Sequence, residues 1–66
     1  MSKTIIYTYK NGIQEEVYSG EYAAIEDALF AANTYRETVD SVEVLFGDKT
    51  YYSECRKGRW EPWSQW

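Results

Sequence analysis

The chain lacks histidine altogether and contains a single cysteine, Cys55, among its 66 residues. One cysteine cannot form a disulfide within the chain, and without histidine or a Cys-X-X-Cys pair a structural zinc site is not expected. Histidine is also the side chain that enzymes use most often as a general base. We therefore expect a protein that holds no metal and no cofactor and that is not an enzyme.

The remaining reactive groups do not form a pattern typical of a catalytic centre. Glu15 and Glu16 are neighbours in an extended segment, so they point to opposite faces and cannot share a proton. Cys55 is expected beside Trp60 on an inner face, where a free cysteine usually acts as a small apolar residue. A glycine-rich phosphate loop is missing too, because the glycines fall at expected turns.

Basic residues are few: 7 lysines and arginines stand against 11 acidic residues, which gives a net charge of −4. Broad nucleic-acid binding requires many cations that displace counterions from phosphates, so this balance disfavours it. The only dense basic cluster is Arg56, Lys57 and Arg59. It is interpreted either as a solvated turn or as a contact to an acidic partner or a nucleic-acid backbone.

Long apolar runs are absent as well, and the N-terminal MSKTIIYTY has the character of neither a signal peptide nor a membrane span. With one free cysteine, a reducing cytoplasm is the expected location. The length fits a single domain over residues 1–66, and a domain of this size buries only about 60% of the surface of its unfolded chain. Its 7 tyrosines, 3 tryptophans and 2 phenylalanines are therefore expected to supply much of the packing.

Asn11-Gly12 separates two segments rich in β-branched and aromatic residues, residues 4–10 and 13–19. Such a pair predicts a β-hairpin with a two-residue type I′ turn. This turn sets the facing pairs: Lys10 with Ile13, Thr8 with Glu15, and Ile6 with Val17. The apolar period then becomes helical from Glu21 to about Arg36, with Ser19 as the candidate N-cap. Phe30 projects away from the apolar stripe and is expected to be partly exposed.

Two further turn signals, Gly47-Asp48 and Lys57-Gly58, connect alternating segments at residues 42–46, 49–56 and 59 onward. The last register places Trp60 opposite Cys55 on the core face, and Pro62 ends regular pairing. Pro62 also favours a short 3₁₀ turn that would bring Trp63 and Trp66 to one side. We expect Trp63 to close the edge of the core and Trp66 to be the tail residue that meets a partner.

These elements predict an α+β fold, an antiparallel β-sheet with one helix packed on one face, in the order β-β-α-β-β-β. The strand order within the sheet remains open at this stage. The expected core consists of Ile6, Val17, Ile25, Ala28, Leu29, Ala32, Val42, Val44, Phe46, Tyr51 and Trp60.

The other face of the predicted sheet has no helix to cover it. It is expected to carry Ile5, Tyr7, Tyr9, Tyr18, Leu45 and Tyr52 among Glu16, Glu43 and Glu54. Three interpretations stay open: ordinary strand residues on a half-wet surface, a protein-binding face, or a stacking platform for single-stranded RNA. The glutamates would repel phosphates and so disfavour the last.

The element order, with a helix near EYAAIEDALFAA and a final hairpin ending in KGRW, resembles that of small phage-encoded inhibitors. These include anti-CRISPR proteins and phage inhibitors of host RNA polymerase. The resemblance implies a stoichiometric protein that blocks a larger host protein or ribonucleoprotein complex by surface contact, in the cytoplasm of a bacterial host cell. It assigns no functional residue.

We therefore predict a non-enzymatic, protein-binding inhibitor. The alternatives are a self-associating structural protein that forms a homodimer through the tyrosine face, and a single-stranded nucleic-acid binder. The residues expected to contact a partner are exposed aromatic and charged side chains: Tyr7, Tyr9, Phe30, Tyr52, Arg56 and Trp66.

Overall fold

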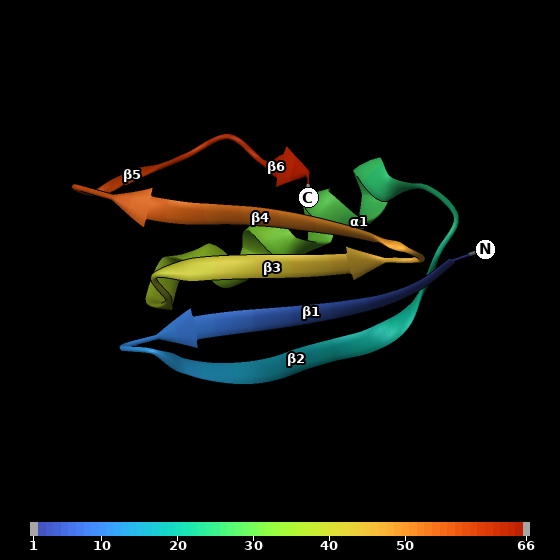
Figure 1. Ribbon diagram of the computed structural model, residues 1–66, viewed down its shortest axis with the longest axis horizontal. Coiled ribbons are helices and arrows are strands. Elements are labelled where there is room, and N and C mark those ends of the chain that lie inside the picture. Colours follow the sequence, from blue (N-terminus) through green and yellow to red (C-terminus); the bar gives the residue numbers. More distant parts are fainter. Residues whose placement is uncertain (1, 66) are drawn as a thin grey trace.

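Six strands and one helical segment follow one another in the computed structural model, which describes residues 2–65 (Figure 1). Their bounds are β1 (Ser2–Lys10), β2 (Ile13–Tyr22), α1 (Ile25–Ala32), the 3₁₀ helix η1 (Asn33–Thr38), β3 (Ser41–Phe46), β4 (Lys49–Arg56), β5 (Arg59–Trp60) and β6 (Ser64–Gln65). The α+β class and the order β-β-α-β-β-β are confirmed. The two-residue strand β6 is an addition to the predicted elements.

The strands form an antiparallel sheet in the order β2-β1-β3-β4-β5, and β6 also pairs with β4 (Figure 1). The first strand of the chain therefore lies inside the sheet, between β2 and β3. Thr4 faces Phe46 across the β1–β3 pair, and Tyr9 faces Ser41. This order joins the two predicted hairpins edge to edge, an arrangement that turn signals alone do not specify.

The predicted turns have the backbone geometry that their residues favour. Asn11 and Gly12 have φ values of 54° and 81°, as a type I′ turn requires at both central positions. Lys57 and Gly58 repeat this pattern with 53° and 79°. The hairpins pair Lys10 with Ile13 and Arg56 with Arg59, so both two-residue turns are confirmed.

A β-bulge at Val17 changes the register of the first hairpin. Tyr7 pairs with Glu16 and Ile6 pairs with Tyr18, so Val17 is an extra residue in β2. The predicted pairing of Ile6 with Val17 is therefore wrong, and so is the placement of Tyr18 on the open face. A bulge inserts one residue and reverses the facing of the strand beyond it, which turns Tyr18 toward the helix.

Gly20 provides the room for this arrangement. A Cβ atom at Gly20 would collide with the hydroxyl of Tyr18, because the tyrosine ring lies across the glycine. The rings of Tyr18 and Tyr22 then meet with their centroids 5.4 Å apart, and both side chains pack against the core. The bulge thus adds two tyrosines to the helix side of the sheet.

The helix begins later than predicted. Ser19 to Tyr22 continue β2 and pair with the first residues of β1, so Ser19 is not an N-cap. Ladder hydrogen bonds satisfy this backbone, whereas an earlier helix would leave the start of β1 unpaired on that side. The N-cap is Ala24, which has no side-chain capping bond. The α-helix ends at Ala32, and helical turns continue as η1 to Thr38.

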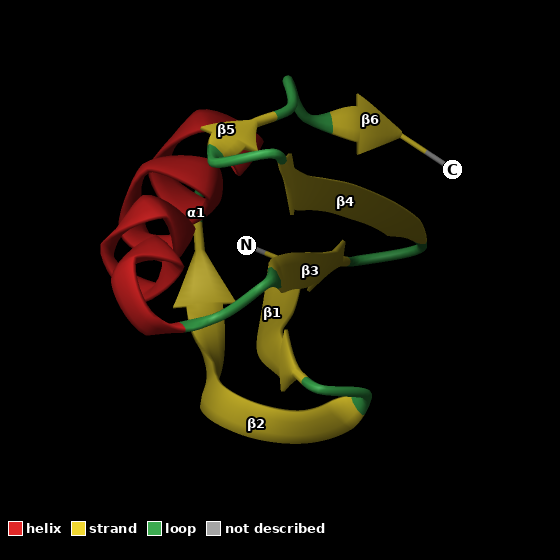
Figure 2. Cartoon of the chain, turned by 90° about the vertical axis from the view of Figure 1, so that its left-hand side faces the viewer, coloured by secondary structure: helices red, strands yellow, loops and turns green. Residues whose placement is uncertain are grey.

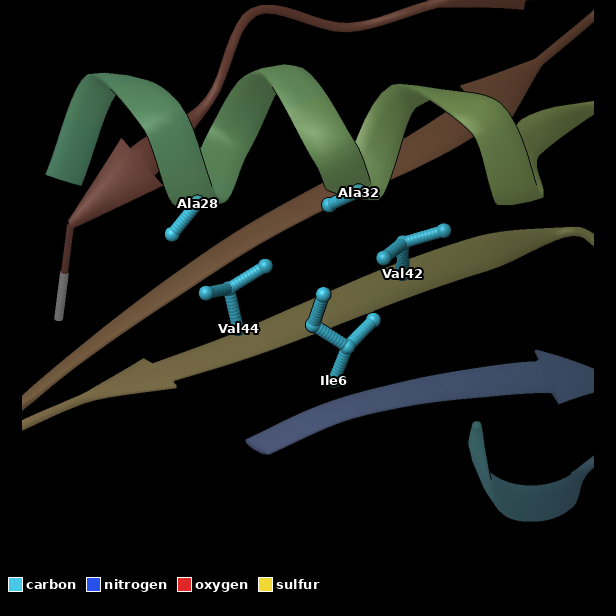
Figure 3. Packing of buried hydrophobic residues seen from close by; sticks show 5 residues of the cluster. All are labelled: Ile6, Ala28, Ala32, Val42 and Val44. Atoms are coloured by element: carbon cyan, nitrogen blue, oxygen red, sulfur yellow. The ribbon is translucent and has the colours of Figure 1, made fainter. Parts of the chain in front are cut away.

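The core lies between the helix and one face of the sheet (Figures 2 and 3). The fully buried apolar residues are Ile6, Ala28, Ala32, Val42 and Val44. The two alanines are one helical turn apart and present little bulk, so the helix approaches β3 closely. The other predicted core residues pack around this centre as half-buried side chains: Val17, Ile25, Leu29, Phe46, Tyr51 and Trp60.

The C-terminal segment runs along the free edge of β4. Trp60 pairs with Cys55 as predicted, the amide of Glu61 donates to the carbonyl of Glu54 at 2.8 Å, and Gln65 pairs with Tyr51. The predicted 3₁₀ turn after Pro62 is therefore wrong for the described residues. Backbone pairing along the open β4 edge satisfies more polar groups than an isolated turn would.

Arg36 holds the C-terminal segment against the rest of the protein through contacts with two tryptophans and a serine. Its guanidinium carbon lies 4.9 Å from the ring centroid of Trp60 and 4.8 Å from that of Trp63. Arg36 Nη2 also donates to Ser53 Oγ at 3.1 Å, and the Ser53 hydroxyl donates to the Glu61 carbonyl at 2.6 Å. Burial lowers the pKa of Arg36, which nonetheless stays charged. Trp63 thus packs against the edge of the core, as its position in the sequence predicts.

Candidate functional site

One whole face of the sheet carries no helix (Figure 2). The strand pairing places six side chains of β1, β3 and β4 at the centre of this face, five of them large and one acidic. These residues, which we call the tyrosine face, are Ile5, Tyr7, Tyr9, Glu43, Leu45 and Tyr52. All of them are half-buried, because neighbouring side chains on adjacent strands cover one another laterally. The predicted open face is thereby confirmed, apart from Tyr18.

The register aligns acids and tyrosines in a single row across four strands. Glu16 on β2 faces Tyr7 on β1, Tyr7 faces Glu43 on β3, and Glu43 faces Tyr52 on β4. Adjacent strands are separated by about 4.8 Å, so consecutive members of the row are within contact distance of one another. The row therefore alternates negative charge with aromatic surface.

Tyr9, two residues after Tyr7 on β1, also contacts Glu43. Its hydroxyl donates to Glu43 Oε1 at 2.6 Å, and its ring stands edge-on to that of Tyr52 with centroids 6.5 Å apart. Ser41 on β3, which pairs with Tyr9, is small and buried. Burial, followed by the hydrogen bond and negative charge of Glu43, raises the pKa of Tyr9.

Arg56 lies at one corner of the open side and is already paired. Its Nη2 lies 2.6 Å from Glu54 Oε1, and its Nε lies 4.0 Å from Glu61 Oε1. The side-chain hydrogen bond to Glu54, with the charges of Glu54 and Glu61, raises the pKa of Arg56. The basic turn thus presents less net positive charge than its three bases suggest, although Lys57 and Arg59 remain exposed.

Phe30, another predicted contact residue, is not part of this surface. Phe30 is 77% exposed and lies on the outer side of α1, because Ala28 and Ala32 occupy the side that faces the sheet. It therefore faces away from the tyrosine face. Trp66 lies outside the described residues. The structure thus brings together Tyr7, Tyr9 and Tyr52, with Arg56 at the margin.

Two residues of this region have structural roles that their positions in the sequence did not predict. Glu43 becomes the centre of three tyrosines only because β3 lies next to β1, and that adjacency has no local signal. Ser41 is the first residue of β3, pairs with Tyr9 and is buried, although the predicted alternating segment begins only at residue 42. Knowledge of the strand order would have identified both.

Hollows in the surface lie at the ends of the sheet. One of about 360 Å³ is bordered by Lys10, Ile13 and Val39, where the first hairpin extends past the helix. Ile13, at 72% exposure, is the most exposed aliphatic side chain there. Another lies beside the basic turn and is bordered by Arg56, Lys57 and Trp60. Among residues 2–65, no helix has the length and apolar character that crossing a bilayer requires.

Comparison of the chain with family models, with curated proteins and with solved structures finds no match.

Proposed function

We propose that this chain is a non-enzymatic inhibitor that binds a larger protein or ribonucleoprotein complex of a bacterial host through its tyrosine face. Binding would be stoichiometric and would block a surface that the target needs for another partner, such as nucleic acid. The proposal includes the earlier expectation of a phage-encoded, anti-CRISPR-like inhibitor.

The observation that carries this proposal is the uncovered sheet face with its three neighbouring tyrosines. Tyr7, Tyr9 and Tyr52 present large rings at one place, and their χ angles are few, so little conformational entropy is lost on binding. Tyrosine is enriched at protein interfaces, and contiguous aromatic surface on a small protein commonly marks one. The acids interleaved among the rings give such a surface electrostatic specificity.

A variant of the tyrosine face tests the proposal. Replacing Tyr7 and Tyr52 together by threonine removes two rings and retains β-branched residues that suit a strand. Wild type and variant would be used for affinity capture from a bacterial lysate. A protein captured by wild type would then be purified and its activity measured with one equivalent of each form. We expect the wild type to inhibit and the variant to lose both capture and inhibition.

The control for this experiment is the fold of the variant. Circular dichroism and urea unfolding should show that the double variant remains folded under the capture conditions. A folded variant that binds and inhibits as well as wild type would show that the tyrosine face is not the binding surface.

The earlier alternatives use overlapping surfaces and have separate measurements. A homodimer through the tyrosine face predicts concentration-dependent sedimentation, which the threonine double variant would abolish. A single-stranded nucleic-acid binder predicts oligonucleotide binding at low salt, where electrostatic affinity is greatest. The pairing of Arg56 with Glu54 and Glu61 argues against the second alternative, because it removes a free cation from the basic turn.

A further inference from the structure

At the centre of the tyrosine face, the carboxylate of Glu43 lies next to three tyrosine side chains. Glu43 has Tyr7 on one side and Tyr52 on the other in the strand register, and Tyr9 donates its hydroxyl to Glu43 Oε1 at 2.6 Å. Tyr9 and Tyr52 also contact each other, with ring centroids 6.5 Å apart. These four side chains come from three adjacent strands, so the sheet itself holds them in position.

This carboxylate has no counter-ion among the residues that the structure describes. Among residues 2–65, the ion pairs join Arg56 to Glu54 and to Glu61, and no lysine or arginine there pairs with Glu43. A carboxylate offers about four acceptor positions on its two oxygens, and the Tyr9 hydroxyl occupies one of them. Glu43 therefore keeps acceptor capacity on a surface whose neighbouring groups are aromatic rings.

A carboxylate among aromatic rings is a receptor for an organic cation. The faces of phenol rings attract cations, and a nearby negative charge adds a direct attraction. A guanidinium group fits this combination best, because it is planar, stacks on rings and donates two parallel hydrogen bonds to a carboxylate. An ammonium group is more strongly hydrated and cannot make this paired contact.

We propose that Glu43, Tyr7, Tyr9 and Tyr52 form a binding site for one arginine side chain of the partner protein. The proposal rests on the proposed function and names the chemistry by which the tyrosine face recognises its target. The arginine belongs to a different protein rather than to a second copy, because two chains that each carry a net charge of −4 repel each other. A target surface that normally binds nucleic acid is rich in such arginines.

The site can be tested without knowing the partner. N-acetyl-L-arginine amide would be titrated into ¹⁵N-labelled protein at low salt, with N-acetyl-L-citrulline amide as the uncharged control of nearly the same shape. We expect saturable chemical-shift changes for arginine at Glu43 and the three tyrosines, and much smaller changes for citrulline. Equal responses to both probes, or arginine shifts confined to other residues, would overturn the proposal.

A pair of charge-removing variants assigns the effect to Glu43. Glu43→Gln retains a carbonyl oxygen for the Tyr9 hydroxyl but removes the charge, so the affinity for the arginine probe should fall at least roughly tenfold. Glu37→Gln changes net charge equally at an exposed residue of η1, which is not part of the tyrosine face, and should leave the affinity within about twofold. Equal losses in the two variants would mean that only overall charge matters.

The same variants separate this inference from the proposed function. If the threonine double variant loses a target that Glu43→Gln still binds with unchanged affinity, the tyrosine face is the binding surface and the arginine site is wrong. If Glu43→Gln also loses the target, the site is supported in the full complex. A concentration-dependent dimer of the wild type that Glu43→Gln abolishes would overturn the assignment of the arginine to a different protein.

Discussion

The guanidinium carbon of Arg36 lies 4.8 Å from the ring centroid of Trp63, and this contact ties the last segment of the chain to the end of the helical segment. The same group lies over Trp60 and bonds to the buried hydroxyl of Ser53. A single side chain thus connects η1, β4 and the residues around β5. Loss of this side chain should loosen the tail and the adjacent edge of the core.

Arg36→Met is expected to destabilise the fold by about 1–3 kcal/mol, because it retains an unbranched apolar stem but loses the cation–π contacts and the bond to Ser53. Urea unfolding followed by tryptophan fluorescence measures the change. Arg56→Met is the matched control: Arg56 is exposed and pairs with Glu54 at the surface, so its loss should lower the free energy of unfolding much less than the loss of Arg36. Equal effects of the two substitutions would contradict the role of Arg36.

The tryptophans of the tail should respond differently to removal. Trp60→Ala deletes a ring packed against the core, and such truncations cost about 3–5 kcal/mol. Because a domain of this size commonly has only about 3–5 kcal/mol of stability, we expect Trp60→Ala to be largely unfolded by circular dichroism. Deleting Trp66, which lies outside the described residues, should leave the domain folded and weaken target binding. A folded Trp60→Ala protein would show that the edge of the core tolerates the loss.

Stability should fall at alkaline pH partly through Tyr9. Its pKa is raised in the folded protein from the ordinary value of 10.0, so its contribution is complete below pH 10 and is lost as the pH rises further. Tyr9→Phe should therefore flatten the decline of unfolding free energy above pH 10. The pKa of Tyr22 is also raised, chiefly by burial, so part of the decline should remain.

The control for this pH profile is the same comparison from neutral pH up to pH 10, where the Tyr9 hydroxyl keeps its proton and its hydrogen bond to Glu43 in the folded protein. In that range the difference in unfolding free energy between wild type and Tyr9→Phe should not change with pH. Identical slopes for wild type and Tyr9→Phe above pH 10 would refute the assignment to Tyr9.

Phe30→Ala should have little effect on stability, within about 0.5 kcal/mol, because the ring is 77% exposed on the outer side of the helix. If the tyrosine face is the binding surface, the same substitution should leave target affinity unchanged, since the two surfaces face opposite ways. Calorimetric titration against the captured target measures this. A clear loss of affinity would show that the helix side also contacts the partner.

Local signals predicted most of the fold. Asn11-Gly12 and Lys57-Gly58 set two hairpins by backbone conformation alone, and the pairing of Trp60 with Cys55 followed from the second of them. The alternation of residues 42–46 correctly divided β3 between the core and the tyrosine face. Each of these inferences depends on residues that are close in the chain.

The errors arose where distant or irregular interactions decide the outcome. No turn residue in the sequence indicates the bulge at Val17. With this bulge, β2 continues past Ser19 and the helix begins later than predicted. The adjacency of β1 and β3 sets Glu43 between Tyr7 and Tyr52, and the tail extends along β4 rather than turning at Pro62. In each case tertiary pairing outweighed local propensity.

The interior position of β1 also bears on how the chain folds during translation. The first hairpin can form as soon as β2 is synthesised, but the second edge of β1 has no partner until the segment up to Phe46 has been made. During that interval the nascent chain exposes a strand edge and the apolar side chain of Ile6, features that favour aggregation. The helix is synthesised within this interval, and its Ala28 and Ala32 belong to the same buried cluster as Ile6, so the helix can cover Ile6 before β3 is complete. The order of elements thus shortens the time for which the incomplete sheet exposes the apolar side chain of Ile6.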